Sequence, residues 1–297
     1  MPEEQPAARR YTGARVRVGG GRARLVPPAA PGPGLVAGQY SVVSPGTERR
    51  HLAGPDREAG YMTLGRTDTS AGWVLAPVPH GAAFDPACPG AVTAPPGMSP
   101  RLVALARFQQ MACLGLDRAP CAELEDAVVM GSGPVAVGCV LELRRRGATR
   151  TTVVTSRRHA PIGRAPGVRC VPPDGAERGH LVIDAAGSPA YAASLTAAGG
   201  VLGLLGTPTP GDMLPALEAH RGGWTVVGMH ELAPAADGAY QSAFTTAALW
   251  LAEHLEPALA DAWCRTVPGV LAPELFALLD APGRPVEPVL LLDWRTG

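Results

Sequence analysis

Residues 126–138 read DAVVMGSGPVAVG, a β-branched run that ends in a glycine-rich turn and continues as an apolar stretch. The run predicts a strand, and the residues after the turn predict a helix. In such a turn the first glycine permits a tight bend, the second lets the backbone approach a pyrophosphate, and a small third residue lets helix pack on strand. The N–H groups at the start of the helix attract phosphate. The stretch therefore predicts a dinucleotide-binding turn made of Gly131, Ser132, Gly133, Pro134, Val135 and Ala136.

The segment from about residue 121 to residue 230 repeats this alternation of strand and helix. Glycine-rich turns are common in a chain of this composition, so the motif becomes specific only through the alternation around it. Ala/Leu-rich stretches separate further β-branched runs, which are TTVVTS (151–156), HLVIDAAG (180–187), GVLGLLG (200–206) and WTVVGM (224–229). This spacing predicts βαβ units in an α/β fold, with a doubly wound parallel sheet of the Rossmann type.

The end of the second strand indicates which dinucleotide the turn would bind. An NAD site places an acidic residue there, about 20 residues beyond the glycines, to accept hydrogen bonds from the ribose hydroxyls. This sequence instead has two hydroxyls and two guanidiniums, which suit a 2′-phosphate. We therefore expect NADP(H) to be preferred over NAD(H), unless the arginines simply solvate a loop. The residues concerned are Thr155, Ser156, Arg157 and Arg158.

Small residues also follow the next two strands of this segment. Ala186 and Gly187 come after the HLVI run, and Gly206 and Thr207 come after GVLGLL. Doubly wound folds bind ligands at the carboxyl ends of their strands, so these positions would leave room for a ribose and a nicotinamide. Ordinary glycine turns are the alternative interpretation of each.

The first hundred residues have a different pattern. Short β-like runs broken by Gly and Pro predict an irregular, antiparallel β-rich unit. The apolar stretch 100–116 then predicts a helix, and PVLLLDW (288–294) predicts a strand that returns to the first unit. We therefore place a GroES-like substrate domain at residues 1–118, completed by 246–297, and the dinucleotide-binding domain at 119–245.

Composition excludes several classes of protein. The 37 Gly and 32 Pro approach a low-complexity composition, but a hydrophobic fraction of 46% is enough for a sizeable core. A formal net charge of zero argues against nucleic-acid and membrane-surface partners. No signal peptide or membrane span is evident, and the six scattered cysteines form no C-x-x-C pair, so we expect a cytoplasmic protein with reduced thiols. All 26 Lys and Arg positions are Arg. This excludes catalysis by a lysine and phosphate binding by a P-loop lysine.

The order of these pieces resembles the medium-chain dehydrogenase/reductase superfamily, the alcohol dehydrogenase-like proteins. The resemblance covers most of the chain: a GroES-like unit, the connecting helix, the GSGPVAVG turn, the VIDAAGS and AAGGVLGLLGTP strands and the C-terminal VEPVLLLDW strand. It implies hydride transfer between NAD(P)(H) and a small-molecule substrate held in a cleft between two domains. It also implies a homodimer formed through the strand at 224–229.

Zinc-dependent members of this superfamily carry ligands that this chain lacks. The segment SPGTE (44–48) has no thiolate where those members have a cysteine, and residues 64–72 have no His-Glu pair. The four-cysteine lobe is missing as well. Nearby Glu48, His51 and Cys88 fit no recognised ligand spacing. The resemblance is therefore to a divergent, zinc-independent member.

Without a metal, hydride transfer needs another source of protons. Thr47 matches the family's relay hydroxyl by position, Glu48 lies beside it, and Tyr61 and His51 come from the same segment. Glu48 could instead tie its loop to backbone N–H groups. His51, expected in a surface loop, could simply be solvated.

The leading hypothesis is an NADPH-dependent oxidoreductase that acts on a small carbonyl or an activated C=C bond. A zinc-free site slightly favours the C=C substrate, whose conjugation spreads the developing charge. The excess of Gly, Ala, Pro and Arg is typical of a GC-rich genome, and this association suggests a tailoring enzyme of secondary metabolism. The main alternative is a catalytically silent, nucleotide-binding regulator or partner subunit, and a third is a lyase or racemase that uses the cofactor transiently. Substrate identity and the direction of hydride transfer stay open.

Overall fold

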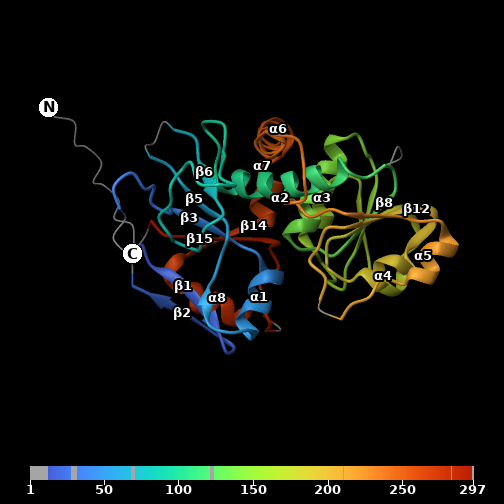
Figure 1. The fold of residues 1–297 in the computed structure, drawn as a ribbon, viewed down its shortest axis with the longest axis horizontal. Helices are drawn as coiled ribbons and strands as arrows, with labels where there is room; N and C mark the ends of the chain where they lie inside the picture. The colour runs from blue at the N-terminus through green and yellow to red at the C-terminus, as the bar shows by residue number, and fades with distance from the viewer. Residues whose placement is uncertain are drawn as a thin grey trace. The chain divides into compact units, whose positions relative to one another are not determined.

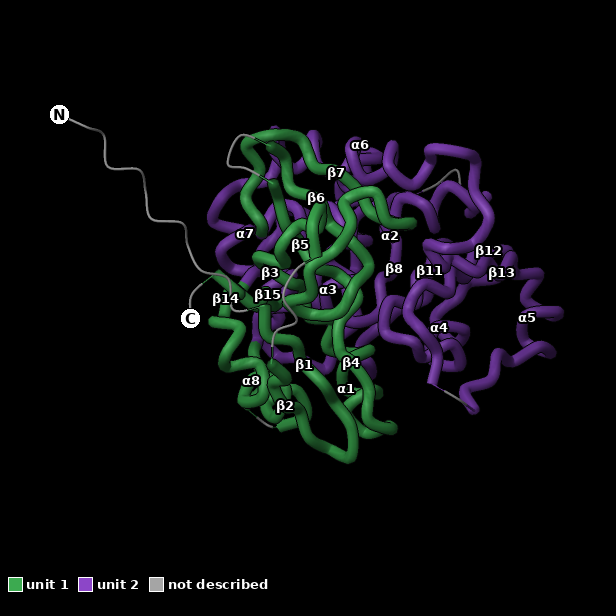
Figure 2. The backbone as a smooth tube through the Cα atoms, turned by 60° about the vertical axis from the view of Figure 1, so that its left-hand side comes forward, with its two compact units in different colours: residues 1–100, 265–285, 290–297 green, residues 101–264, 286–289 purple. Residues whose placement is uncertain are grey.

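The computed structural model describes residues 13–27, 32–67, 71–120, 124–209, 211–281 and 283–295. The chain divides into two compact units, which Figure 2 draws in different colours. Unit 1 contains the described parts of residues 1–100, 265–285 and 290–297, and unit 2 contains those of residues 101–264 and 286–289.

Six of the described strands form the parallel sheet of unit 2. They are β8 (Ala127–Met130), β9 (Thr151–Val154), β10 (Val168–Val171), β11 (Gly179–Asp184), β12 (Thr196–Leu204) and β13 (Thr225–Gly228). Across the sheet they lie in the order β10-β9-β8-β11-β12-β13, with parallel pairing throughout. Numbered along the chain, this is the order 3-2-1-4-5-6 of a doubly wound dinucleotide fold. The predicted fold class is confirmed, and the order reverses between β8 and β11.

Helices cover both faces of this sheet. They are α2 (Pro100–Leu116), α3 (Pro134–Arg145), α4 (Pro189–Ser194), α5 (Ala216–Gly222), α6 (Ala239–His254) and α7 (Pro257–Trp263), with short 3-10 turns at Pro161–Arg164 and Pro173–Gly175. On one face, Val128, Met130 and Val182 pack with Ala192 and Ala193 of α4. In Figure 1, α3 lies on the other side of the strands. Because both faces are covered, the central strand β8 is a continuous buried run rather than an alternating one.

Backbone contacts hold α2 against the rest of unit 2. A Cβ atom on Gly138 of α3 would lie 2.1 Å from the carbonyl oxygen of Phe108, so only glycine permits this approach. A Cβ atom on Gly115 would lie 2.8 Å from that of Met229, next to β13. Every residue from Val103 to Leu116 is buried. The helix is therefore part of the packing of the parallel sheet.

The division between the units differs from the predicted domain boundaries. It falls after residue 100 rather than after 118, and after residue 264 rather than after 245. The physical reason is the packing of α2 and α6: Cys113 and Leu114 of α2 contact Ala243 of α6 within unit 2.

Unit 1 is β-rich, with antiparallel pairing around β1 and β3. Its strands are β1 (Arg15–Gly19), β2 (Arg22–Val26), β3 (Tyr40–Val43), β4 (Arg57–Glu58), β5 (Thr63–Gly65), β6 (Val74–Ala76), β7 (Val92–Thr93), β14 (Cys264–Pro268) and β15 (Val289–Asp293). Their orders are β2-β1-β4 and β14-β15-β3-β5-β6-β7. The C-terminal strand β15 pairs with β3, with Leu291 opposite Val42, as its apolar sequence predicts. Two helices, α1 (Pro45–Ala53) and α8 (Ala272–Leu278), and a 3-10 turn at Gly269–Leu271 complete the unit.

The sequence does not predict β10 or α1. Strand β10 has four residues, one of them the exposed Arg169, so its apolar pattern is weak. Helix α1 has two buried residues, Glu48 and Leu52, which is too little for an apolar stripe. Within the described residues no helix is long and apolar enough to cross a membrane. The cysteines in the described part of the chain are free thiols, namely Cys88, Cys113, Cys139, Cys170 and Cys264. Cys121 lies outside the described residues.

Candidate nucleotide-binding site

The predicted glycine turn joins β8 to α3. Gly131 has a φ of +97°, which residues with a side chain rarely adopt. Its N–H donates to the main-chain oxygen of Val154 at 2.8 Å. Gly133 caps the start of α3 in an extended conformation, and Pro134 follows in the first turn. A Cβ atom on Gly133 would meet no other atom within 4 Å, so this residue faces open space. A glycine turn before a helix N-terminus is the arrangement that binds a pyrophosphate in dinucleotide-binding folds, so this turn is the candidate site.

The residues of the turn and of the start of α3 differ in their burial and in their neighbours. Ala136 is buried, as the small third position of the motif requires, whereas Val135 is partly exposed. A Cβ atom on Gly131 would lie 3.3 Å from that of Ala186, which follows β11. The glycine turn thus contacts the second group of predicted site residues.

A buried aspartate organises the ends of β11 and β12. Asp184 Oδ1 accepts hydrogen bonds from the N–H of Ala186 at 3.0 Å and of Gly187 at 2.8 Å. Its main-chain oxygen accepts one from Gly206 at 2.7 Å. A Cβ atom on Gly206 would lie 2.6 Å from the nitrogen of Gly187, and one on Gly187 would lie 2.2 Å from the oxygen of Thr207. The structure therefore brings Ala186, Gly187, Gly206 and Thr207 together in one cluster.

The electrostatic state of Asp184 reflects two opposed effects. Burial raises the pKa of the carboxyl, and the N–H groups of residues 186–188 oppose the shift. Its Oδ2 atom is buried and has no hydrogen-bond partner within the described part of the chain. The sequence signal for this role is an aspartate directly followed by small residues at a strand end, a pattern typical of side-chain-stabilised turns.

Two buried hydroxyls connect the glycine turn to the end of β9. Ser132 Oγ and Thr155 Oγ1 lie 2.8 Å apart, and either can donate. The main-chain N–H of Arg157 donates to Thr155 Oγ1 at 3.2 Å. The sequence points to Ser132 and Thr155 as nucleotide contacts but not to this bond, because the bond depends on β8 and β9 being neighbours.

The residues after Thr155 differ in exposure and partners. Ser156 and Arg158 are exposed, and Arg157 is partly buried. Arg157 Nη1 donates to the main-chain oxygen of Val286 at 3.1 Å. Among the described residues, the side chains of Ser156 and Arg158 have no hydrogen bond or ion pair. A hydroxyl and a guanidinium are therefore available at this strand end, where the sequence contains no carboxylate.

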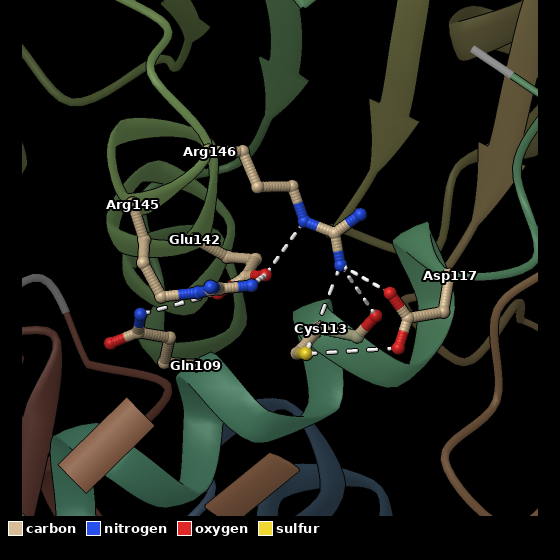
Figure 3. A network of polar contacts seen from close by, with 6 residues as sticks. All are labelled: Gln109, Cys113, Asp117, Glu142, Arg145 and Arg146. Carbon is tan, nitrogen blue, oxygen red and sulfur yellow. Dashed lines mark hydrogen bonds and ion pairs between the residues drawn. The ribbon is translucent and has the colours of Figure 1, made fainter. Parts of the chain in front are cut away.

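A buried carboxylate fixes α3 to α2 (Figure 3). Glu142 accepts hydrogen bonds from Arg145 at 2.7 Å, Arg146 at 2.7 Å and Gln109 at 3.2 Å. Arg146 also pairs with Asp117 at 2.6 Å. Burial alone would raise the pKa of Glu142, but the two guanidiniums hold it below its usual value. The carboxylate is therefore charged at neutral pH, and the helix that carries the glycine turn is fixed at its far end.

Cys113 belongs to the same network but has no reactive character. Its Sγ atom lies 3.8 Å from Arg146 Nη2 and 3.9 Å from Asp117 Oδ2. Burial raises the pKa of the thiol to about 11. The thiol is therefore protonated at neutral pH and a poor nucleophile.

A second buried ion pair joins α2 to the segment after β13. Arg107 is 3% exposed, pairs with Glu231 and lies over the ring of Tyr240, with 5.2 Å from Cζ to the centroid. Gln110 Nε2 donates to the main-chain oxygen of Tyr240 at 2.6 Å. Burial raises the pKa of Tyr240 to about 12, so its phenol stays protonated. The sequence does not predict this pair, because Arg107 lies within an apolar run.

The four predicted proton donors all lie in unit 1. Thr47, Glu48 and His51 are on α1, and Tyr61 precedes β5. Ser44 Oγ donates to Thr47 Oγ1 at 3.4 Å. Thr47 and His51 are one helical turn apart, so they share a face of α1. The expectation that His51 lies in a surface loop is wrong, because the segment continues as a helix to Ala53.

Glu48 is fully buried and pairs with a histidine that the sequence does not single out. Glu48 Oε1 lies 3.1 Å from His80 Nε2, and His80 Nδ1 lies 2.8 Å from Ser41 Oγ. The indole N–H of Trp294 donates to the same Ser41 oxygen at 2.9 Å. The carboxylate therefore has a structural partner, as the alternative interpretation of Glu48 anticipates. The partner is an imidazole, however, and not a set of backbone N–H groups.

The remaining donors keep contact with solvent. Thr47, His51 and Tyr61 are partly exposed. Burial lowers the pKa of His51, and the nearby Arg57 lowers it further. His51 is therefore neutral at pH 7 and a weak proton donor.

Comparison with solved structures shows which fold these two units form. Alcohol dehydrogenase TADH from Thermus sp. ATN1 is similar with a TM-score of 0.73 at 15% identity, over 94% of this chain and 99% of that one. The 2R,3R-butanediol dehydrogenase from Bacillus subtilis gives 0.70 at 13%, over 94% and 99%. The yhdH oxidoreductase from Salmonella enterica, solved in complex with NADP, gives 0.62 at 17%, over 95% and 99%. The chain has the medium-chain dehydrogenase fold. No protein-family model and no curated protein matches the sequence.

The medium-chain dehydrogenase fold here carries no evident metal centre in its described parts. Among the described residues, no three His, Cys, Asp or Glu side chains are grouped so that they could hold a metal ion. Residues 68–70, within the stretch where a His-Glu pair would fall, lie outside the described residues.

The Glu142 network predicts how this medium-chain dehydrogenase fold responds to acid. The pKa of Glu142 is lower in the folded chain than in the unfolded chain, so its stabilisation is complete above the unfolded value, about 4.3, and is lost as pH falls through the folded value. We expect Glu142→Gln to lower the free energy of unfolding by roughly 3 kcal/mol at pH 7, because it leaves two guanidiniums without their carboxylate. The loss should shrink below pH 4, as denaturant unfolding at a series of pH values would show.

Asp126→Asn is the matched control, since it removes an exposed partner of Arg150. This variant should leave unfolding almost unchanged. Equal stability of Glu142→Gln and the wild type at pH 7 would contradict the assigned role of the network.

Proposed function

We propose that this chain is a cytoplasmic oxidoreductase that binds NADPH and transfers hydride to a small carbonyl or an activated C=C bond. The observation that carries the proposal is the glycine turn between β8 and α3, which faces open space at Gly133. The glycine turn borders that space, and the neighbouring strand end provides hydroxyls and guanidiniums without a carboxylate. When bound, a nicotinamide dinucleotide would supply or accept the hydride. The complex of the Salmonella enterica oxidoreductase with NADP supports a nucleotide of this class.

The preference for NADP(H) over NAD(H) rests on the turn after β9. A guanidinium binds a phosphate with paired, charge-assisted hydrogen bonds. Arg158 and Ser156 are exposed and have no partner among the described residues, so they are the groups best placed to contact a 2′-phosphate. Ribose hydroxyls without that phosphate would find no carboxylate acceptor in residues 155–158.

Proton transfer falls to side chains of unit 1 in this proposal, because the segments that would hold zinc lack its ligands. Glu48 is a poor candidate, since it is buried against His80. His51 is weakened by its lowered pKa. Thr47 and Tyr61 are therefore the preferred donors, as partly exposed hydroxyls.

Turnover tests the activity directly. We expect the purified chain to oxidise NADPH with some members of a panel of small aldehydes, ketones and conjugated enones, without stoichiometric zinc and without loss of rate in a chelator. Gly133→Val should raise the dissociation constant for NADPH at least about tenfold, because the new side chain occupies the open space that Gly133 faces. NADPH binding without turnover would favour the silent regulator, absence of binding would reject the proposal, and stoichiometric zinc would reject zinc independence.

Arginine substitutions test the phosphate contact. We expect Arg158→Ala to weaken NADPH binding about tenfold, because a charge-assisted contact is lost, and to leave NADH binding unchanged. Arg164→Ala is the control, since Arg164 is an exposed arginine in the same unit. Equal losses for both nucleotides, measured by calorimetric titration, would count against a 2′-phosphate contact.

We also propose a homodimer formed through β13. This strand is an edge of the parallel sheet, and Val226 on it is 37% exposed. Met213, Leu217 and Leu232 nearby in the sequence are exposed as well. An open apolar edge favours pairing with a second copy. Light scattering should give a molar mass of two chains for the wild type and of one chain for Val226→Lys. A monomeric wild type would rule the dimer out.

A further inference from the structure

The hydrogen-bond ladder of the parallel sheet continues beyond β8 and β9 through two side chains. The N–H of Gly131 donates to Val154 at 2.8 Å, and the N–H of Thr155 donates to Val171 of β10 at 2.9 Å. Where this backbone pairing stops, the hydroxyls of Ser132 and Thr155 lie 2.8 Å apart. The second residue of the glycine turn is therefore bonded to the first residue after β9.

The hydroxyl of Thr155 has little capacity left for a ligand. A hydroxyl has one proton and two lone pairs. The N–H of Arg157 takes one lone pair at 3.2 Å, and Ser132 takes either the proton or the second lone pair. Thr155 is 8% exposed and Ser132 is 7% exposed. Both hydroxyls therefore serve contacts within the protein rather than contacts with a ribose.

We propose that Thr155 is a positioning residue that sets the preference for NADPH over NADH through its neighbours. Its bond to Ser132 holds the glycine turn, which would contact the pyrophosphate common to both nucleotides. Its bond to the N–H of Arg157 holds the backbone between Ser156 and Arg158, which would contact the 2′-phosphate of NADPH alone. One side chain thus fixes the distance between the two phosphate-binding segments. This inference rests on the proposed function.

A purely structural role makes a different prediction. Buried hydroxyls are paired in most proteins simply because an unpaired one is unfavourable. If that were all, substitution of Thr155 would lower stability and would change the affinities for NADPH and NADH by the same factor. The ratio of the two dissociation constants therefore separates the two roles.

Calorimetric titration of the full chain with each nucleotide provides the test. Thr155→Val keeps the shape of the side chain and removes both of its hydrogen bonds. We expect it to weaken NADPH binding about tenfold and NADH binding about threefold, so that the preference narrows. Ser132→Ala removes the contact with the glycine turn alone, so both nucleotides should weaken by one factor and the preference should persist. Thr155→Ser retains the hydroxyl and should restore both affinities.

Two further variants sharpen the comparison. Thr152→Val is the matched control, because it is the same substitution on β9 at a partly exposed position; it should leave both affinities unchanged. The Ser132→Ala/Thr155→Val double variant should lose less affinity than the two single losses combined, because both substitutions remove the same bond.

The outcomes separate this inference from the proposed function. A wild type that binds neither nucleotide overturns both. A wild type that binds NADPH, together with a folded Thr155→Val variant of unchanged preference, overturns the positioning role alone. If Thr155→Val does not fold, Thr155→Ala decides by the same ratio of dissociation constants: a narrowed preference for NADPH supports the positioning role, and an unchanged preference overturns it.

Discussion

The carboxyl edge of the parallel sheet depends on the burial of one carboxylate. Peptide N–H groups converge on Asp184, among them those of Ala186 and Gly187 on its side chain and those of Leu205 and Gly206 on its main-chain oxygen. Removal of the carboxyl from water is unfavourable, and the N–H groups offset only part of that penalty, since its pKa stays raised. These hydrogen bonds hold the turns after β11 and β12 close together. Neither Gly187 nor Gly206 then admits a Cβ atom, so backbone atoms form this part of the sheet edge.

The helix behind the glycine turn is held by contacts far from that turn. At its middle, Gly138 lets α3 touch the backbone of α2 at Phe108. Near its end, the buried Glu142 accepts hydrogen bonds from two guanidiniums and an amide. Two points of contact along its length prevent the helix from rotating or sliding. Its N-terminus therefore keeps its position next to the end of β8. The rigidity that the proposed phosphate site requires would thus come from ordinary helix packing and from an ion network at the far end of the helix.

The sequence predicts those features of the fold and the site that are local along the chain. Parallel strands covered on both faces appear as continuous β-branched runs, and the glycine turn is a contiguous motif, so both were predictable. The pairing of Ser132 with Thr155 spans 23 residues and that of Glu48 with His80 spans 32, and each depends on which strands become neighbours. Local pattern carries no such information. Helix α2 illustrates the same limit for domains, since an apolar helix can pack with either unit, and its contacts with α3 and α6 decide which.

In a chain without lysine, arginine supplies all the side chains that are permanently cationic, so arginine content by itself identifies no phosphate site. The guanidinium is planar and weakly hydrated, which lets it enter buried ion pairs that an ammonium would enter less readily. Arg107 is buried with Glu231, and Arg146 shares Glu142 with its neighbour on α3. Their charges are already neutralised by carboxylates of the chain itself. Arg158 differs, since it is exposed beside a strand end that has no carboxylate and has no partner in the described part of the chain. Their partners therefore distinguish the arginines that neutralise the chain's own carboxylates from Arg158, whose charge the proposed 2′-phosphate would neutralise.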